Sequence, residues 1–298
     1  MKPIKYIALV CCGIAFGATG YSCTKGNEKD DKPVLTVSLE PQRYLLEQIV
    51  GDNFKVVSLM PNGDNPEMFD PSPARRIDVE NSLAYFTIGH LPFEDNLKLT
   101  AKDTTIFVTT TVGIEPIYGT HSHDCDHSTF LPSGIEEIID ADPHMWTSVR
   151  NARVMSRIMV ERVVKLDPAH ADEYAERYEK FDAHLDSLDR AFAARLDSLP
   201  NKAFLVWHPS LSYFARDYGM EQLAVGHESK EMSINALRSV ISEAKADSVR
   251  VFFYQRDYDS RQAEAISSSI GARLVPVNPG SYEWEKELNT IVDELAKP

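Results

Sequence analysis

The chain has 298 residues, of which 43% are hydrophobic and 26% are charged. This composition is typical of globular proteins, and the length allows one large domain or two lobes with separate cores. The formal net charge of −14 at pH 7 argues against nucleic acid or an anionic membrane surface as the main partner, because both repel an acidic protein.

The N-terminus has the pattern of an export signal. Two lysines precede the apolar run IALVCCGIAFGA, which is too short to span a bilayer comfortably. The run ends in TGYSC and is followed by the polar sequence TKGNEKDDKP, an arrangement that resembles a bacterial lipoprotein signal. We therefore expect a signal peptide over 1–22, a lipid on the thiol of Cys23 and a flexible tether over 23–33. Cleavage without lipidation is the alternative, because Gly20 stands where such signals usually carry leucine.

Residues 34–149 predict an N-terminal α/β lobe. The segment PQRYLLEQIVG has its apolar side chains on one helical stripe and a glycine at its end, which indicates a helix. Short runs rich in β-branched and aromatic residues indicate strands around this helix and after it. These strands are expected at 34–39, 54–60, 84–88 and 104–110. The alternation of strands with helical stretches is typical of a parallel sheet.

Residues 150–200 form a predicted helical region. No glycine occurs over 151–198, and Pro168 is the only proline there. From Pro168 onward, large apolar side chains recur at steps of three or four residues, which predicts an amphipathic helix that begins at this proline. They are Tyr174, Tyr178, Phe181, Leu185, Leu188 and Phe192. A helix of about thirty residues would be roughly 45 Å long, which is more than one compact lobe needs.

Residues 201–298 return to alternating strands and helices and predict a C-terminal α/β lobe. The expected strands are KAFLVW, RVFFYQ and RLVPVN, and the expected helices include INALRSVISEAKA, SRQAEAISSSIGA and WEKELNTIVDELAK. The fold class that follows is α/β, with two βα lobes of mostly parallel sheets. One long rigid helix would join the lobes, with a metal cleft between them.

The stretch GTHSHDCDHS over 119–128 is rich in groups that bind metal ions. His121, His123 and His127 alternate there with two aspartates and Cys125. Imidazole is the commonest metal ligand in proteins, and short histidine-rich tracts often bind metal. No predicted rigid element would fix tetrahedral geometry here, so we interpret the stretch as an accessory, low-affinity metal loop. A solvated polar loop is the alternative.

The positions after the strands carry a second set of candidate ligands. Ligands of open α/β sheets bind beyond the carboxyl ends of the strands. The side chains found there are Asp64, Glu67, Asp70, His144, His208, Gln255, Asp257 and Asn278. Nitrogen and oxygen ligands in this mixture suit Zn²⁺ or Mn²⁺. One histidine at a strand end is more often structural, but a pair from two lobes on one rim predicts that His144 and His208 bind metal.

Several motifs together resemble a known protein family. They are PEMFDPSP, YFTIGHLPFED, DPHMW, VWHPSLSYFARDYG and the tail VFFYQ, AEAISSSIG and VNPG, in this order from about Val34 to the C-terminus. The chain resembles the cluster A-I substrate-binding lipoproteins of ABC transporters, which capture zinc or manganese. The resemblance implies two α/β lobes with a rigid long helix behind them, in agreement with the predicted elements.

The resemblance also implies a set of metal ligands. His144 and His208 match the family's two histidines, whereas Glu67 stands where the first histidine is usual. Asn278 replaces the usual last aspartate, and Gln255 stands where many members carry an acid. Glu67 would complete a set of two histidines and a carboxylate, which several zinc enzymes also use. Asn278 and Gln255 would be weaker, uncharged ligands.

The resulting functional hypothesis is a non-catalytic, extracytoplasmic receptor. It would bind a divalent ion, Zn²⁺ or else Mn²⁺, as transported ligand and deliver it as a monomer to an ABC permease in the inner membrane. It would be exported and lipid-anchored to a bacterial membrane facing the periplasm. The alternatives are a zinc-dependent hydrolase, for which neither an H-E-x-x-H motif nor an obvious general base is present, and a relative of the same fold whose degraded metal site binds another ligand.

Overall fold

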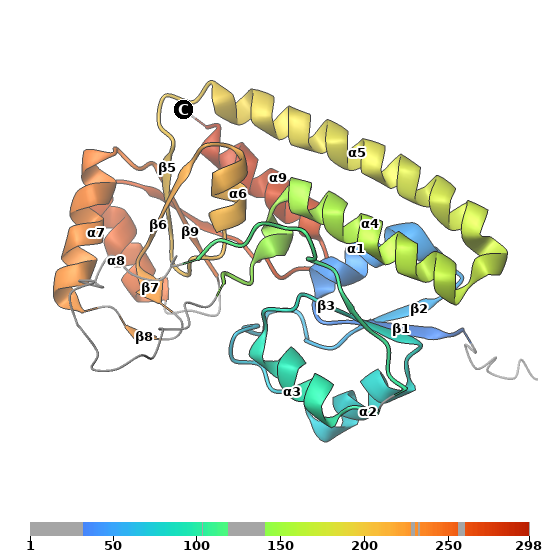
Figure 1. Cartoon of the computed structure of the whole chain (residues 1–298). Coiled ribbons are helices and arrows are strands. Elements are labelled where there is room, and N and C mark those ends of the chain that lie inside the picture. Colours follow the sequence, from blue (N-terminus) through green and yellow to red (C-terminus); the bar gives the residue numbers. More distant parts are fainter. Residues whose placement is uncertain are drawn as a thin grey trace, which may run out of the picture. The chain divides into compact units, whose positions relative to one another are not determined.

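Two four-stranded parallel sheets organise the described part of the chain (Figure 1). The computed structural model describes residues 32–102, 104–118, 141–227, 230–231, 233–255 and 260–297. The predicted signal peptide, Cys23, nearly all of the tether and the histidine-rich stretch 119–128 lie outside the described residues. Residues 32–298 form one compact unit, and no helix of the described residues is long and apolar enough to cross a membrane.

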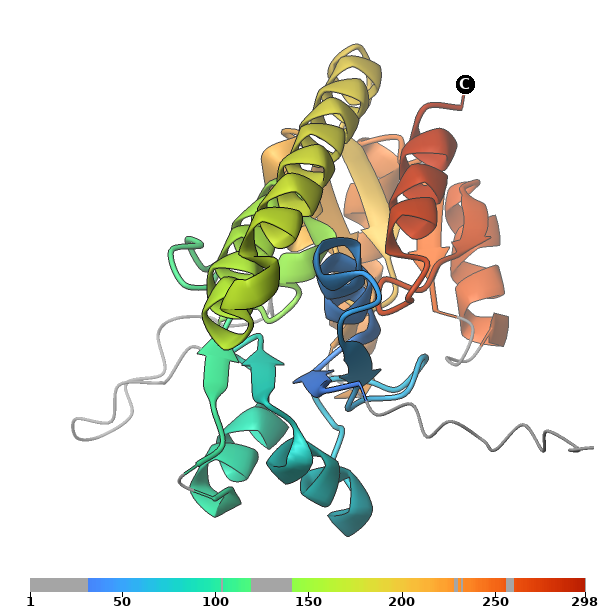
Figure 2. The same ribbon diagram turned by 90° about the vertical axis from the view of Figure 1, so that its right-hand side faces the viewer.

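The N-terminal sheet has the strand order β2-β1-β3-β4. Its elements are β1 (Val34–Val37), α1 (Glu40–Val50), β2 (Lys55–Ser58), α2 (Pro73–Asn81), β3 (Ala84–Thr87), α3 (Pro92–Thr100) and β4 (Phe107–Thr109). Helices α2 and α3 lie on one side of this sheet, and α1 lies on the other (Figures 1 and 2). Gly51 ends α1 with a φ of 54°, and a side chain there would collide with the guanidinium of Arg177. The glycine thus stops the helix and allows close packing.

The C-terminal sheet has the strand order β10-β9-β5-β6. Its elements are β5 (Ala203–Val206), α6 (Ser212–Asp217), β6 (Glu221–Ala224), α7 (Ile234–Ala246), β9 (Val251–Tyr254), α8 (Ser260–Ile270), β10 (Arg273–Pro276) and α9 (Trp284–Leu295). The short strands β7 (Gly226–His227) and β8 (Lys230–Glu231) pair in antiparallel fashion beside this sheet. The sequence did not predict β6, because its segment EQLA has only four positions and begins with two polar residues, so it shows no strand pattern.

Two long helices, α4 (Val149–Leu166) and α5 (Ala171–Asp197), form a hairpin above both sheets (Figure 1). A single-turn 3₁₀ helix over Pro168–His170 separates them, so the long helix begins at Ala171 and not at Pro168. Arg153 on α4 binds Asp182 on α5 through two hydrogen bonds of 2.7 and 2.8 Å. Because α5 contacts α1 of one lobe and α9 of the other, the prediction of a long helix behind two lobes is confirmed.

One hydrophobic core continues from the N-terminal sheet through the hairpin into the C-terminal lobe. It includes Phe86 of β3, Met155 of α4, Phe192 of α5 and Phe253 of β9, all of them almost completely buried. A second, smaller core lies in the C-terminal lobe around Phe252. The shared core couples the two lobes mechanically, because close-packed interiors transmit displacement.

Candidate metal centre

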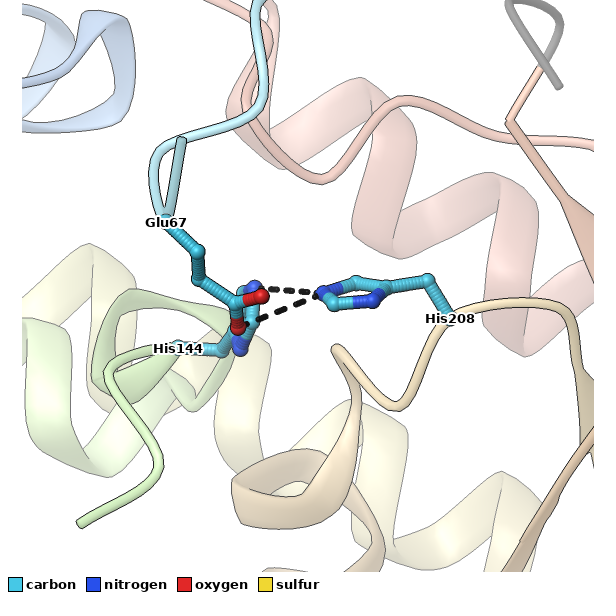
Figure 3. A group of neighbouring side chains, drawn as sticks. All are labelled: Glu67, His144 and His208. Carbon is cyan, nitrogen blue, oxygen red and sulfur yellow. Dashed lines mark hydrogen bonds and ion pairs between the residues drawn. The ribbon is translucent and has the colours of Figure 1, made fainter. Parts of the chain in front are cut away.

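Three side chains that the sequence placed at strand ends converge on one point (Figure 3). The Nε2 atom of His208 lies 3.3 Å from the Nε2 atom of His144 and 3.6 Å from Oε1 of Glu67. All three ligand atoms lie within 4.8 Å of one another. Among the described residues, this is the one group of three or more His, Cys, Asp or Glu side chains with that geometry.

Each of the three side chains comes from a different connecting segment. Glu67 lies in the loop between β2 and α2, and His208 follows β5 directly. His144 precedes a single-turn 3₁₀ helix, η1 (Met145–Thr147), which leads into α4. Both histidines are buried, with 2% and 6% of their surfaces exposed, whereas Glu67 is half-buried. The carboxylate oxygens of Glu67 are buried as well, so the group is screened from bulk water.

The separations fit a tetrahedral ion. Zinc binds imidazole nitrogen at about 2.0–2.1 Å, so two such ligands at the tetrahedral angle lie about 3.3–3.4 Å apart. The distance between the two Nε2 atoms is 3.3 Å. The distance from His208 to Glu67 is 3.6 Å, which needs a shift of a few tenths of an ångström. The group could thus hold a tetrahedral ion after a small movement of one side chain.

Asp142 fixes the orientation of the His144 ring. Its Oδ1 atom lies 2.8 Å from Nδ1 of His144 and accepts the backbone N–H of the same residue at 2.8 Å. A carboxylate at Nδ1 favours a proton on that nitrogen and leaves Nε2 available as the metal ligand.

The contact between Asp142 and His144 shifts the pKa values of both side chains. Burial lowers the pKa of His144, but the charge and hydrogen bond of Asp142, together with the charge of Glu67, outweigh it, so the pKa is raised above 6.5. Burial raises the pKa of Asp142, but the neighbouring imidazole and the hydrogen bonds outweigh it, and the pKa is lowered. Asp142 is therefore charged near neutral pH.

The other predicted ligands lie near the group without joining it. Asn278, Gln255 and Asp64 line, together with His144, a cleft with a volume of about 420 Å³. The amide of Asn278 donates to Oδ1 of Asn62 at 2.9 Å and accepts the N–H of Gly280 at 3.1 Å. Both ends of this amide are thus engaged in holding loops. Asp70 instead pairs with Arg76 at 2.7 Å, and Asp257 lies outside the described residues.

The fold and the three-residue group can be compared with known proteins. The profile of the family ZnuA, described as zinc-uptake complex component A, periplasmic, matches residues 35–295. The chain belongs to this family. As a ZnuA-family protein it is a solute-binding component of a metal-uptake system and not an enzyme. The fold class and the functional class predicted from the sequence are thereby confirmed.

Individual relatives of this ZnuA-family chain are distant. The high-affinity zinc uptake system protein ZnuA of Bacillus subtilis is 25% identical over 279 residues, which cover 91% of this chain and 86% of the relative. The zinc-binding lipoprotein AdcA of Streptococcus pneumoniae is 23% identical over 300 residues, covering 94% of this chain and 55% of the relative.

Solved structures show the same fold. The crystal structure of a ZnuA deletion mutant with zinc bound has a TM-score of 0.78 at 29% identity, covering 89% of this chain and 97% of that chain. A manganese-bound periplasmic metal-binding protein from Candidatus Liberibacter asiaticus has a TM-score of 0.73 at 20% identity, covering 89% and 100%. The second likeness concerns the fold alone.

Sequence reasoning missed two residues around the group in this ZnuA-family chain. Asp142 was not singled out, although a carboxylate two positions before a candidate histidine ligand is a usable signal for an orienting partner. The indole of Trp146 packs beside the site, with its ring centroid 5.1 Å from that of His144. Tyr213 was not considered at all, and its contacts depend on the folded chain.

Proposed function

We propose that the protein captures one divalent transition-metal ion between Glu67, His144 and His208 and delivers it to the permease of an ABC transporter. The single observation that carries the proposal is the convergence of two imidazole nitrogens and a carboxylate oxygen within 4.8 Å. Membership of a family described as a periplasmic zinc-uptake component supports the same role.

Zinc is the ion that the ligand set favours. Two imidazoles and one carboxylate in a small, nearly tetrahedral arrangement are typical zinc ligands, whereas manganese prefers octahedral sites richer in oxygen. The 3.3 Å separation of the imidazole nitrogens supports the tetrahedral choice. A relative described as a zinc-binding lipoprotein agrees with this choice. We therefore propose zinc as the main ligand and manganese as a weaker one.

The fourth coordination position would be filled from the adjoining cleft. Asn278 and Gln255 line this cleft with His144 and offer neutral amides. Because the amide of Asn278 already holds Asn62 and Gly280, we propose that it orients a water molecule near the ion and does not bind the ion directly. An ion with three protein ligands and one water is easier to release, as a transport protein requires.

The parts of the chain outside the described residues fit the same role. We propose that residues 1–22 are an export signal, that Cys23 carries a lipid anchor and that the tether leads into lobes at 34–149 and 201–298. The helical region 150–200 would join the lobes. The protein would face the periplasm, where His121, His123 and His127 of the accessory loop would bind further zinc weakly. A relative described as a zinc-binding lipoprotein supports the anchor.

The test is zinc binding by the soluble form that lacks residues 1–23. Metal analysis and titration calorimetry should give one tightly bound equivalent, which His144→Ala and His208→Ala should each remove. His184→Ala is the matched control, because this histidine is half exposed and pairs with Glu285 on the far helices. If neither ligand substitution alters stoichiometry or affinity, the proposed site is wrong. Deleting residues 120–128 should leave the tight equivalent intact and remove only weak ones.

A further inference from the structure

A buried tyrosine of the C-terminal lobe contacts the segment that carries His144. Tyr213, on α6, is completely buried. Its hydroxyl donates to the backbone carbonyl of Asp142 at 2.8 Å and accepts the backbone N–H of Ile117 at 3.1 Å. The N–H of Asp142 in turn donates to the carbonyl of Ile117 at 2.8 Å. The hydroxyl therefore closes a small network that fixes the backbone of Asp142.

This network ends at a metal ligand. The side chain of Asp142 holds both the backbone N–H and the Nδ1 atom of His144 at 2.8 Å. The other imidazole, His208, lies in the connection between β5 and α6, five residues before Tyr213. One short segment thus supplies one ligand itself and positions a second ligand through Asp142.

Further contacts attach the His144 segment to the C-terminal lobe. The indole N–H of Trp146 donates to the carbonyl of Pro279 at 2.9 Å, and that of Trp284 donates to the carbonyl of Trp146 at 2.7 Å. The hydroxyl of Ser148 bonds to the carboxylate of Asp217 on α6. His144 follows the N-terminal sheet in sequence, yet its segment is held by residues of the other lobe.

Glu67 lies on the N-terminal lobe. Its loop follows β2 of the N-terminal sheet, and its backbone N–H donates within the loop, to Oδ1 of Asn65 at 2.9 Å. Residues 61–70 of this loop are half-buried or exposed, in contrast to the two buried histidines. The three ligands therefore divide into a pair on the C-terminal lobe and a single carboxylate on the N-terminal lobe.

We propose that Tyr213 is a positioning residue of the metal centre, which holds Asp142, and through it His144, in register with His208 before metal binds. This inference rests on the proposed function. The imidazole pair is then preformed, and the metal ion bound to it recruits Glu67 from the other lobe. Preorganised ligands raise affinity because little ordering entropy is lost when the ion binds.

The size of the effect follows from the position of Tyr213 in the network. Loss of a residue that orients a metal ligand typically weakens metal binding by about 10- to 100-fold. Tyr213 acts one step further out, so we expect Tyr213→Phe to weaken zinc binding by roughly tenfold, the lower end of that range. Burial raises the pKa of Tyr213 to about 12, so the hydroxyl keeps the proton that it donates at any pH of interest.

A matched control lies at the end of the same helix. Tyr218 is also buried, and its hydroxyl donates to Oδ1 of Asp189 on α5 at 2.9 Å, away from the metal centre. Tyr213→Phe and Tyr218→Phe each remove one buried hydroxyl, so both should lower the melting temperature of the metal-free protein to a similar extent. Only Tyr213→Phe should weaken Zn²⁺ binding and change the visible absorption spectrum of the Co²⁺-loaded protein. Equal zinc affinities of the two variants would overturn the proposal.

A double-mutant cycle tests whether Tyr213 acts through Asp142. Zinc affinity is measured by chelator competition for wild type, Tyr213→Phe, Asp142→Ala and the double variant. Asp142→Ala removes the carboxylate that connects the tyrosine to His144. Residues in one network are non-additive, so the tyrosine substitution should cost about tenfold in the wild type and little in the Asp142→Ala background. Equal costs in both backgrounds would contradict the proposal. If wild type binds no zinc, the proposed function fails instead.

Hydrogen exchange of the wild type needs no variant. If the network is formed before metal arrives, the backbone amides of Ile117, Asp142 and His144 should exchange slowly in the metal-free protein, because each donates within it. Exchange of these amides at the rate of an unstructured chain, with protection only after Zn²⁺ is added, would overturn the preformed pair.

Discussion

Asp142→Asn is the substitution that probes the chemistry of the site most finely. The asparagine keeps an amide oxygen where Oδ1 of Asp142 accepts from the backbone and from the ring of His144, both at 2.8 Å. It loses the negative charge. The shape of the site should therefore remain while the electrostatic support of the imidazole disappears.

The magnitude follows from the type of hydrogen bond that is lost. A bond to a charged group contributes about 1.5–3 kcal/mol, against about 1 kcal/mol for a neutral one. A difference of about 1.5 kcal/mol corresponds to roughly tenfold in the dissociation constant. We expect this loss of zinc affinity at pH 8, where protons compete less strongly with the metal for His144 than at pH 6.

The loss of zinc affinity caused by Asp142→Asn should be smaller at pH 6 than at pH 8. The charge of Asp142 helps to raise the pKa of His144 above 6.5, so in the wild-type protein a proton occupies the imidazole at pH 6 and must leave before zinc binds. Removing the charge lowers this pKa and weakens the competition. The ratio of variant to wild-type dissociation constants should therefore fall between pH 8 and pH 6.

The assay is chelator competition for Zn²⁺ at both pH values. Asp189→Asn is the control. The Asp189 carboxylate, like that of Asp142, accepts hydrogen bonds from two groups, here Arg150 and Tyr218, but it lies on α5 and contacts no metal ligand candidate through these bonds. Unchanged zinc affinity of Asp142→Asn at pH 8, or a ratio that grows toward pH 6, would refute the reasoning.

Three further predictions concern the bound ion. Glu67→Gln should weaken zinc binding at least tenfold in calorimetry, because a neutral amide replaces a carboxylate. The zinc affinity of Glu67→His should stay within tenfold of that of the wild type. Equal affinities of wild type and Glu67→Gln would contradict a ligand role for Glu67. Zinc affinity of the wild type should fall as the pH drops below the raised pKa of His144, by about one decade per pH unit for each competing proton. Calorimetry in buffers of different ionisation enthalpy should detect the proton that zinc binding releases. Zinc at 100 times its dissociation constant should stabilise the fold by about 2.7 kcal/mol; scanning calorimetry should show this shift for wild type and lose it after EDTA treatment or in His144→Ala.

Much of the fold could be predicted because its strands are short, strongly apolar runs. VLTV, AYFT and AFLV are almost fully buried in parallel sheets, and such strands stand out in sequence. Helix α2 has only Val79 buried, so its apolar periodicity is too weak to detect. Helix α4 ends before Asp167, which has φ −135° and ψ 77°, because the residue before a proline is disfavoured in the helical conformation.

The candidate site was predictable where residue type and strand end coincide. His144, His208 and Glu67 follow strands or lie in the loops beyond them, and parallel strands bring these ends together. The bond from Asn278 to Asn62 in the loop of Glu67 depends on a tertiary contact that no local pattern encodes. The same holds for Tyr213, which contacts a backbone carbonyl and stands in the sequence only as one of two aromatic residues in α6.

The most direct test of the central claim is zinc K-edge X-ray absorption on the mature protein loaded with one equivalent of Zn²⁺. The account predicts four nitrogen and oxygen neighbours at about 2.0–2.1 Å, with outer-shell scattering from two imidazoles. A sulfur neighbour at about 2.3 Å, or scattering from three or more imidazoles, would place the ion on the histidine-rich stretch with Cys125 and contradict the account.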